Sequence, residues 1–201
     1  MTTERHGTHG IDRAQLAEFA EHAAENPEAV QFELGARASY EGTCAHSLGK
    51  IDQYTLGGDT IDRETREYTI PYGGWKEVLE AGGWIAPTDR PEPIEVALSA
   101  LAACLNVGIS LNAVANGVDF DELKTTVSAE FDPAVLFSLA ELRASDSVFD
   151  NVTADIEIEG DDVDKDMIDE WARRAPVYTL ISQPQDIELT VEAPQEITAG
   201  D

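Results

Sequence analysis

Residues 93–118 read PIEVALSALAACLNVGISLNAVANGV, and the last twenty-three of them carry no charge in a chain in which 26% of the residues are charged. Pro93 suits the first turn of a helix, where its missing N–H has no partner to lose, and Gly117 suits a helix C-cap. The stretch therefore predicts one long helix, Ile94–Asn116. Because this helix would be apolar nearly all round, we expect other elements to pack on more than one of its sides.

The same stretch is near the ~20 residues that a membrane span needs. It contains three asparagines, however, and acidic residues flank it on both sides without a lysine or arginine bias to orient it. We therefore interpret it as the core helix of a domain and expect no membrane partner.

The overall charge is strongly negative: forty acidic residues face thirteen basic ones, for a formal net charge of −27. Such a surface repels nucleic acids and anionic membranes, so we expect neither as a partner. Self-repulsion should destabilise the fold in dilute buffer, whereas ~1 M salt shortens the screening length to about 3 Å. The composition therefore predicts the protein of a halophile, with an acidic mesophilic protein as the alternative.

The location expected from the sequence is the cytoplasm. The N-terminus is polar and acidic and does not have the pattern of a signal peptide. Two cysteines, Cys44 and Cys104, do not make a disulfide framework for a chain of 201 residues.

Hydrophobic periodicity predicts an α+β fold with antiparallel sheets around the long central helix. Expected helices are Ile11–Asn26, Ile94–Asn116, one opening at Asp161 and reaching Arg174, and a turn at Val177–Ser182; expected strands lie in Ala29–Leu56, Arg66–Pro71, Leu123–Phe131, Val152–Glu159 and Ile187–Val191, and Tyr72–Pro93 is a loop-rich bridge. We divide the chain into a helical extension (1–28), one domain (29–193) and a tail (194–201).

Several blocks of the sequence resemble one family. Pro93–Cys104 looks like the start of the central helix in the OsmC/Ohr proteins, the osmotically inducible protein C and organic hydroperoxide resistance proteins. The resemblance continues in the following blocks: Ala113–Val118, Leu123–Glu130, Arg173–Tyr178 and Gln183-Pro184. It covers roughly residues 29–193 and implies an OsmC-like fold that forms an intertwined homodimer with sites at the interface.

The resemblance also implies a chemistry. Family peroxidases defend against oxidative stress by reducing organic hydroperoxides with a reactive and a resolving cysteine, supported by an arginine and a glutamate. Cys104 falls on the reactive position and Arg37 resembles the family arginine, with Arg173 and Arg174 as alternatives. Since a buried thiol is a poor source of thiolate, one of these cations should stabilise it.

Two positions depart from the family pattern. Ala175 stands where the resolving cysteine is expected, and we do not expect Cys44, in the N-terminal sheet, to replace it. The glutamate that usually follows the proline directly is Ile94 here, and Glu95 is one position late, which is about 100° around a helix.

Two functions of different classes follow. The first is reduction of organic hydroperoxides by Cys104 alone, with Arg37 stabilising the thiolate, Glu95 orienting Arg37, an external thiol as reductant and no bound cofactor or metal. The second is a non-enzymatic member that binds a small apolar or thiol-bearing molecule and keeps Cys104 as an inert buried thiol. Nothing in the sequence specifically supports a third use of the cysteine, in a transferase or hydrolase.

The charge of −27 makes a testable prediction about salt. We expect the melting temperature to rise from dilute buffer to multimolar KCl, because screening removes the repulsion between carboxylates. Thermal melts followed by circular dichroism check this. Greater stability in dilute buffer would contradict the halophilic interpretation.

Overall fold

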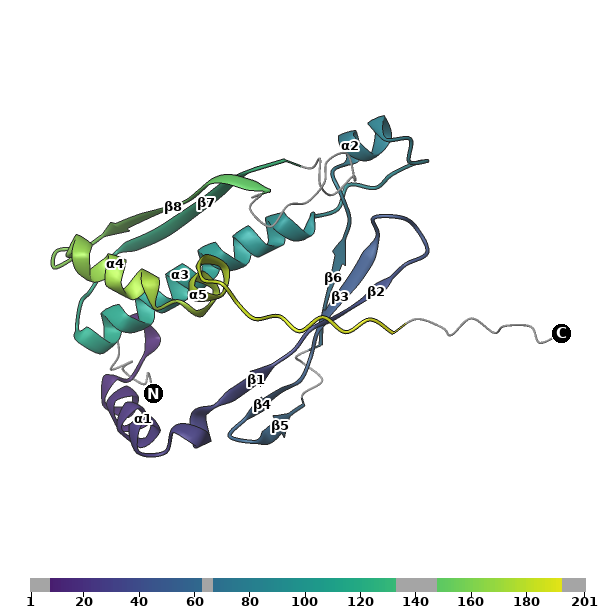
Figure 1. Cartoon of the computed structure of the whole chain (residues 1–201). Helices are drawn as coiled ribbons and strands as arrows, with labels where there is room; N and C mark the ends of the chain where they lie inside the picture. The colour runs from purple at the N-terminus through teal and green to yellow at the C-terminus, as the bar shows by residue number, and fades with distance from the viewer. Residues whose placement is uncertain (1–7, 63–66, 133–147, 193–201) are drawn as a thin grey trace, which may run out of the picture.

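The computed structural model describes residues 8–62, 67–132 and 148–192, and it combines small antiparallel sheets with one long helix (Figure 1). The predicted α+β class, the antiparallel sheets and the long central helix are confirmed. The proposed tail, residues 194–201, lies outside the described residues, as does the start of the N-terminal extension.

The N-terminal half contains two sheets of three short antiparallel strands each, ordered β1–β4–β5 and β2–β3–β6. Their bounds are Phe32–Leu34 (β1), Arg37–Tyr40 (β2), Ser47–Ile51 (β3), Tyr54–Leu56 (β4), Asp59–Ile61 (β5) and Tyr68–Tyr72 (β6). Gly57 and Gly58 join β4 to β5 with φ values of 58° and 85°, a left-handed conformation that glycine adopts without a side-chain clash. Alternation predicted strands in Ala29–Leu56 and Arg66–Pro71 but missed β5, which lies between these ranges. It did not predict the division into two sheets, because pairing depends on register.

The central helix α3 spans Pro93–Asn116, within one residue of its predicted start. Gly117 ends it in the left-handed conformation with φ 77°. At its start, the Glu92 side chain accepts the N–H of Ile94 at 2.6 Å, and the Glu95 side chain accepts the N–H of Glu92 at 2.9 Å. This reciprocal pair is a capping box, so local sequence determines both ends of α3.

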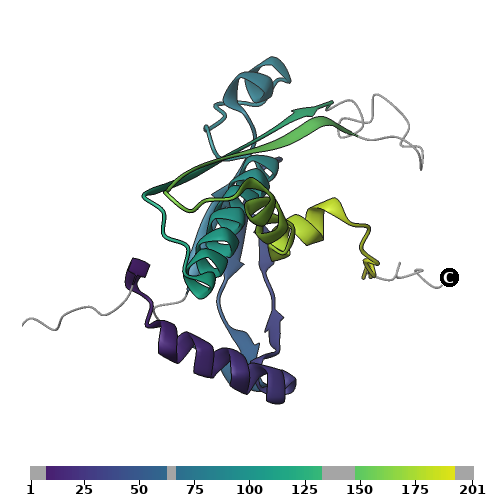
Figure 2. The same ribbon diagram turned by 90° about the vertical axis from the view of Figure 1, so that its left-hand side faces the viewer.

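Strands β7 (Glu122–Phe131) and β8 (Phe149–Glu159) pair antiparallel and lie along one side of α3 (Figures 1 and 2). Helices α4 (Lys165–Arg173) and α5 (Pro176–Ser182) pack against α3 as well. The buried core gathers between these elements and consists of Leu101, Leu105, Ile109, Ala113, Ile168, Trp171, Ala172 and Ala175. Among the described residues, strands β1–β6 contribute nothing to this cluster.

The N-terminal helix α1 (Arg13–Glu25) begins at Asp12, whose side chain accepts the N–H of Ala14 at 2.9 Å, and it buries no residue. It lies near the C-terminal end of α3. Short 3₁₀ turns precede and follow it at Thr8–Gly10 (η1) and Pro27–Val30 (η2). In η1, the His9 ring stacks on Phe120 with 4.2 Å between centroids, which attaches the extension to the loop before β7.

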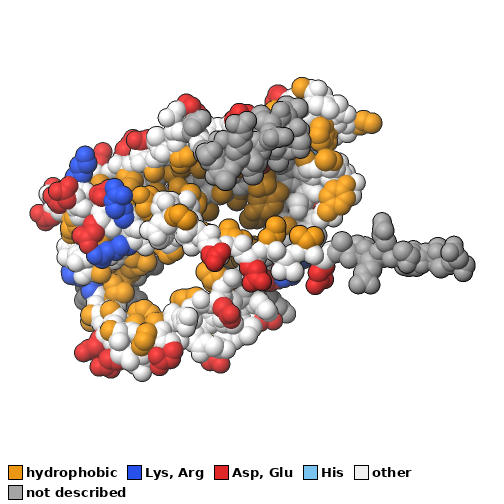
Figure 3. Space-filling view, in the orientation of Figure 1, with side chains coloured by type: hydrophobic (Ala, Val, Ile, Leu, Met, Phe, Trp, Pro, Cys, Tyr) orange, Lys and Arg blue, Asp and Glu red, His pale blue; other side chains and the backbone are white. Residues whose placement is uncertain are grey.

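Much apolar surface stays uncovered in the single chain. Leu34 on β1, Tyr40 on β2 and Val107 on α3 are 75%, 69% and 57% exposed. Although α3 is long and apolar enough to cross a membrane, and packs against β7, α4 and α5, only 17% of its most apolar window is buried. Figure 3 shows hydrophobic side chains bordering an open gap between the two halves of the molecule.

Two local predictions were wrong. Ile187–Val191 joins no sheet within the described residues, because alternation supplies an amphipathic strand but not the neighbouring edge that must accept its hydrogen bonds. The helix expected from Asp161 begins only at Lys165, because the side chain of Asp164 caps it by accepting the N–H of Met167 at 3.0 Å. The bridge Tyr72–Pro93 contains a short helix, α2 (Lys76–Ala81).

The capping box predicts how Glu95 contributes to stability. Replacing Glu95 by Ala should lower the free energy of unfolding by about 1 kcal/mol, because the N–H of Glu92 loses its acceptor. Glu95→Gln keeps an acceptor oxygen, so its free energy of unfolding should fall by less. Chemical denaturation of the three proteins in multimolar KCl measures this. Equal stability of all three would show that the capping box contributes nothing.

Candidate functional site

Cys104 lies in the middle of α3 and is half-buried against the core. Its Sγ accepts the backbone N–H of Val177 at 3.4 Å, from the first turn of α5. A backbone N–H aimed at sulfur stabilises negative charge on that atom. The sulfur is thus neither free in solvent nor enclosed by hydrocarbon alone.

Small residues allow α5 to come this close. Ala175, the residue before α5, is 1% exposed, and a Cβ placed on Gly108 would lie 3.5 Å from the Cβ of Ala175. Gly108 is one helical turn beyond Cys104 on the same side of α3. The position at which the resemblance implies a resolving cysteine therefore packs beside the turn that carries Cys104.

Arg37 lies on β2 and donates to the Asp52 carboxylate, not to Cys104, within the described part of the chain. This hydrogen bond from Arg37 is the main reason that the pKa of Asp52 is lowered. Glu95 belongs to the capping box of α3 and accepts from Glu92 rather than orienting Arg37. A single chain thus does not bring the three predicted site residues together.

The two alternative arginines are also paired. Arg173 donates to both carboxylate oxygens of Asp169, at 2.7 and 2.9 Å, and a third N–H reaches the Tyr178 hydroxyl at 3.2 Å. Arg174 pairs with Glu170. The hydrogen bond from Arg173 lowers the pKa of Asp169, so any stabilisation by this exposed pair is present above the carboxyl's ordinary pKa and is lost as pH falls through the lowered value.

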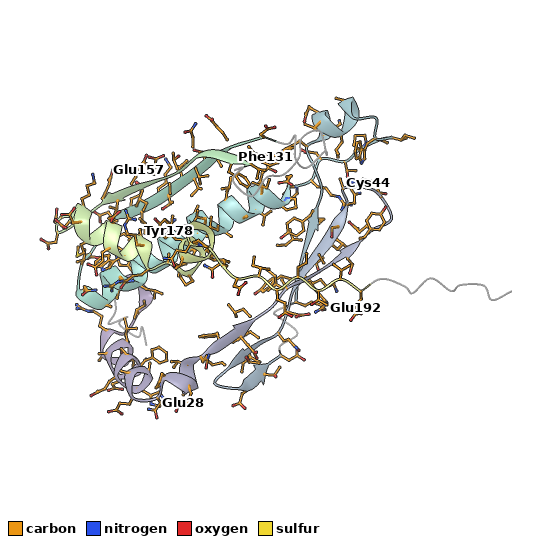
Figure 4. The ribbon with its side chains drawn as sticks, in the orientation of Figure 1. Glu28, Cys44, Phe131, Glu157, Tyr178 and Glu192 are labelled. Atoms are coloured by element: carbon orange, nitrogen blue, oxygen red, sulfur yellow. The ribbon has the colours of Figure 1, made fainter. Side chains whose placement is uncertain are left out.

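A cavity of about 450 Å³ opens beside this Asp169–Arg173–Tyr178 group. Its lining comes from α3, β8, α4 and α5 and consists of Leu101, Leu105, Val152, Thr153, Ala154, Ile156, Asp169, Ala172, Arg173, Tyr178, Ile181 and Ser182. Figure 4 shows Tyr178 on α5, beside α3. The sequence did not predict this cavity. The sequence shows that α3 is apolar, but it does not show that α4 and α5 leave part of this helix uncovered.

Other candidate residues do not join this group. Cys44 is exposed, in the loop between β2 and β3, well apart from Tyr178 in Figure 4. Its carbonyl accepts from the Trp84 indole N–H at 2.9 Å, so Trp84 anchors the loop that follows α2. Across residues 8–62, 67–132 and 148–192, no three His, Cys, Asp or Glu side chains gather where they could hold a metal ion.

Comparison with known proteins agrees with this architecture. A family model described as OsmC-like protein matches residues 86–190, just over half of the chain and including α3, β7, β8, α4 and α5. The chain is similar to the crystal structure of an OsmC-like protein from Mycoplasma pneumoniae, with a TM-score of 0.50 and 15% identity over 75% of this chain and 87% of that one.

A second solved structure, from Psychrobacter arcticus 273-4, is provisionally described as an osmotic stress induced and detoxification response protein. Its TM-score is 0.45, with 14% identity over 75% of this chain and 90% of that one. No protein with a curated description matches. Because the family model covers more than half of the sequence, and includes the long helix that carries Cys104, the chain belongs to the OsmC-like protein family.

Proposed function

We propose that the protein reduces organic hydroperoxides with Cys104 as its nucleophile. The observation that carries this proposal is the position of Cys104: it lies on the central helix of an OsmC-like domain, half-buried, with the N–H of Val177 directed at its sulfur. This contact holds the sulfur in a defined place, and the thiolate is the form of cysteine that attacks peroxides.

The reaction balances with a thiol as the external reductant. The Cys104 thiolate attacks the distal oxygen of the hydroperoxide, the O–O bond breaks, and the alkoxide leaves and takes up a proton as the alcohol. Cys104 is thereby oxidised to a sulfenic acid. One external thiol condenses with it and releases water, and a second releases the Cys104 thiol and forms the external disulfide. We expect this cycle in a reducing cytoplasm, because Ala175 cannot act as the internal reductant.

The homodimer is part of the same proposal. A three-stranded sheet needs a covered apolar face, yet Leu34 and Tyr40 remain exposed on the N-terminal sheets, as Val107 does on α3. A second copy would cover these surfaces. Since Arg37 does not reach Cys104 within its own chain, we propose that Arg37 acts on the Cys104 of the other copy. Glu95, which caps α3 and does not contact Arg37 in its own chain, would then position the Arg37 of the other copy.

The dimer predicts a molar mass of about twice 21.8 kDa by light scattering in multimolar KCl. Val107→Glu should shift the protein toward a monomer, because it buries a charge in the interface. Thr126→Glu is the matched control, since it adds the same charge on the exposed outer face of β7. A monomeric wild-type protein, or equal effects of the two substitutions, would contradict the dimer.

The proposed peroxidase activity predicts that Cys104 reacts with a hydroperoxide and that Cys44 does not. One equivalent of cumene hydroperoxide in multimolar KCl should add one oxygen atom to Cys104, as detected by intact mass and peptide mapping. Cys44→Ser should react like the wild-type protein, and Cys104→Ser should not react. An unreactive Cys104, or oxidation of Cys44 at the same rate, would overturn the proposal.

Ala175→Cys provides an independent check on the geometry. Because Ala175 packs beside the turn that carries Cys104, the introduced thiol should condense with the sulfenic acid and form a disulfide within one chain. The oxidised variant would then lack two hydrogen atoms instead of carrying an extra oxygen. A stable sulfenic acid in this variant would show that the two positions do not meet.

A specific observation favours a second candidate function, the binding of a small molecule. The cavity between α3, β8, α4 and α5 is lined by Leu101 and Leu105 of α3, and Cys104 is not part of its lining. A ligand could therefore bind there whether or not Cys104 reacts.

A further inference from the structure

The cavity has the size and walls of a small-molecule site. Its volume of about 450 Å³ lies within the range of ~300–1,000 Å³ that is usual for such sites. Its floor is rigid, because Leu101, Leu105 and Ala172 belong to the buried core and are no more than 7% exposed. Val152 and Ile156 of β8 form one apolar wall, and Ile181 of α5 forms another.

One end of the cavity is polar, and Arg173 is the donor in each of the hydrogen bonds described there. Asp169 accepts two hydrogen bonds from Arg173, and Arg173 donates a third to the Tyr178 oxygen at 3.2 Å. A phenol has a single O–H. Because the Tyr178 oxygen already accepts from Arg173, its own proton is available to donate to a bound molecule. Ser182 adds a second hydroxyl to the lining.

The charges in the lining select against an ionic ligand. Asp169 and Arg173 are the charged residues in the lining and neutralise each other through a bidentate pair. A carboxylate ligand would therefore meet no free cation in the lining. An ammonium ligand would meet no free carboxylate. An uncharged hydrogen-bond acceptor needs neither a free cation nor a free carboxylate in the lining.

We propose that this cavity binds a neutral, elongated amphiphile, with an apolar chain against Leu101, Leu105 and Ile156 and an uncharged oxygen that accepts the Tyr178 O–H. A medium-chain alcohol has this chemistry. The proposal deepens the second candidate function and requires no redox step at Cys104, so the two proposals can fail separately.

Ligand binding in this cavity would also affect the surroundings of the Cys104 thiol. Helix α5 provides both Tyr178 in the cavity lining and the Val177 N–H that faces the Cys104 sulfur. On α3, Leu101 and Leu105 lie on either side of Cys104 in the sequence. An occupied cavity would hold α5 against α3 and keep this N–H on the sulfur.

The test is calorimetric titration with 1-octanol, octanoate and octylammonium in multimolar KCl, on full-length Cys104→Ser protein, so that thiol chemistry cannot contribute. We expect saturable binding of 1-octanol that is at least ten times tighter than binding of either ion. Tyr178→Phe keeps the ring and removes the donor, so it should weaken 1-octanol binding about 5- to 10-fold. The matched control, Tyr40→Phe on β2, should bind as the parent does.

A second variant fills the cavity. Ala154→Trp adds a large side chain at an exposed position of the β8 wall and should abolish binding without lowering the melting temperature. The proposal is wrong if 1-octanol does not saturate, if octanoate binds as tightly, or if Tyr178→Phe binds like the parent. It is also wrong if 1-octanol binds only to the Val107→Glu monomer, because a second copy of the chain would then fill the cavity.

Discussion

Burial of one face of α3 against β7, α4 and α5 is the contact on which the rest of the described structure depends. Leu105 and Ile109 are almost completely inaccessible there, so this face positions the elements around it. The small residues Gly108 and Ala175 let α5 approach closely. That approach places the Val177 N–H on the Cys104 sulfur and, on the neighbouring side, leaves the cavity between α5 and β8.

The N-terminal half has no such buried contact with α3 among the described residues. Its strands are hydrogen-bonded in two small sheets, but they share no core with α3, and residues such as Leu34 and Tyr40 stay exposed. Sheets of this size are not expected to be stable without a covered face. A second copy would provide that cover and would also explain why Arg37, paired with Asp52 in its own chain, is separate from Cys104. The charge of −27 opposes such an association in dilute buffer, so salt and assembly should be coupled.

Sequence reasoning succeeded where the signal is local. Pro93 and Gly117 marked the ends of α3, and alternation marked β7 and most of β8. It failed where a feature depends on a contact with another part of the chain. Ile187–Val191 alternates like a strand but has no neighbouring edge among the described residues. The capping contact of the Glu95 carboxylate was also not predicted. The cavity was invisible, because it depends on how far α4 and α5 extend over α3.

The amino-acid sequence by itself determined the family, the central helix, the position of Cys104 upon it and the absence of a cysteine at Ala175. These features depend on residue identity and on spacings within one element. Only the tertiary structure decided that the Val177 N–H meets the sulfur, that Arg173 of α4 reaches Tyr178 of α5, and that an apolar cavity remains beside them. The physical reason is that these contacts join residues up to 73 positions apart, and their geometry follows from helix packing that no local pattern encodes.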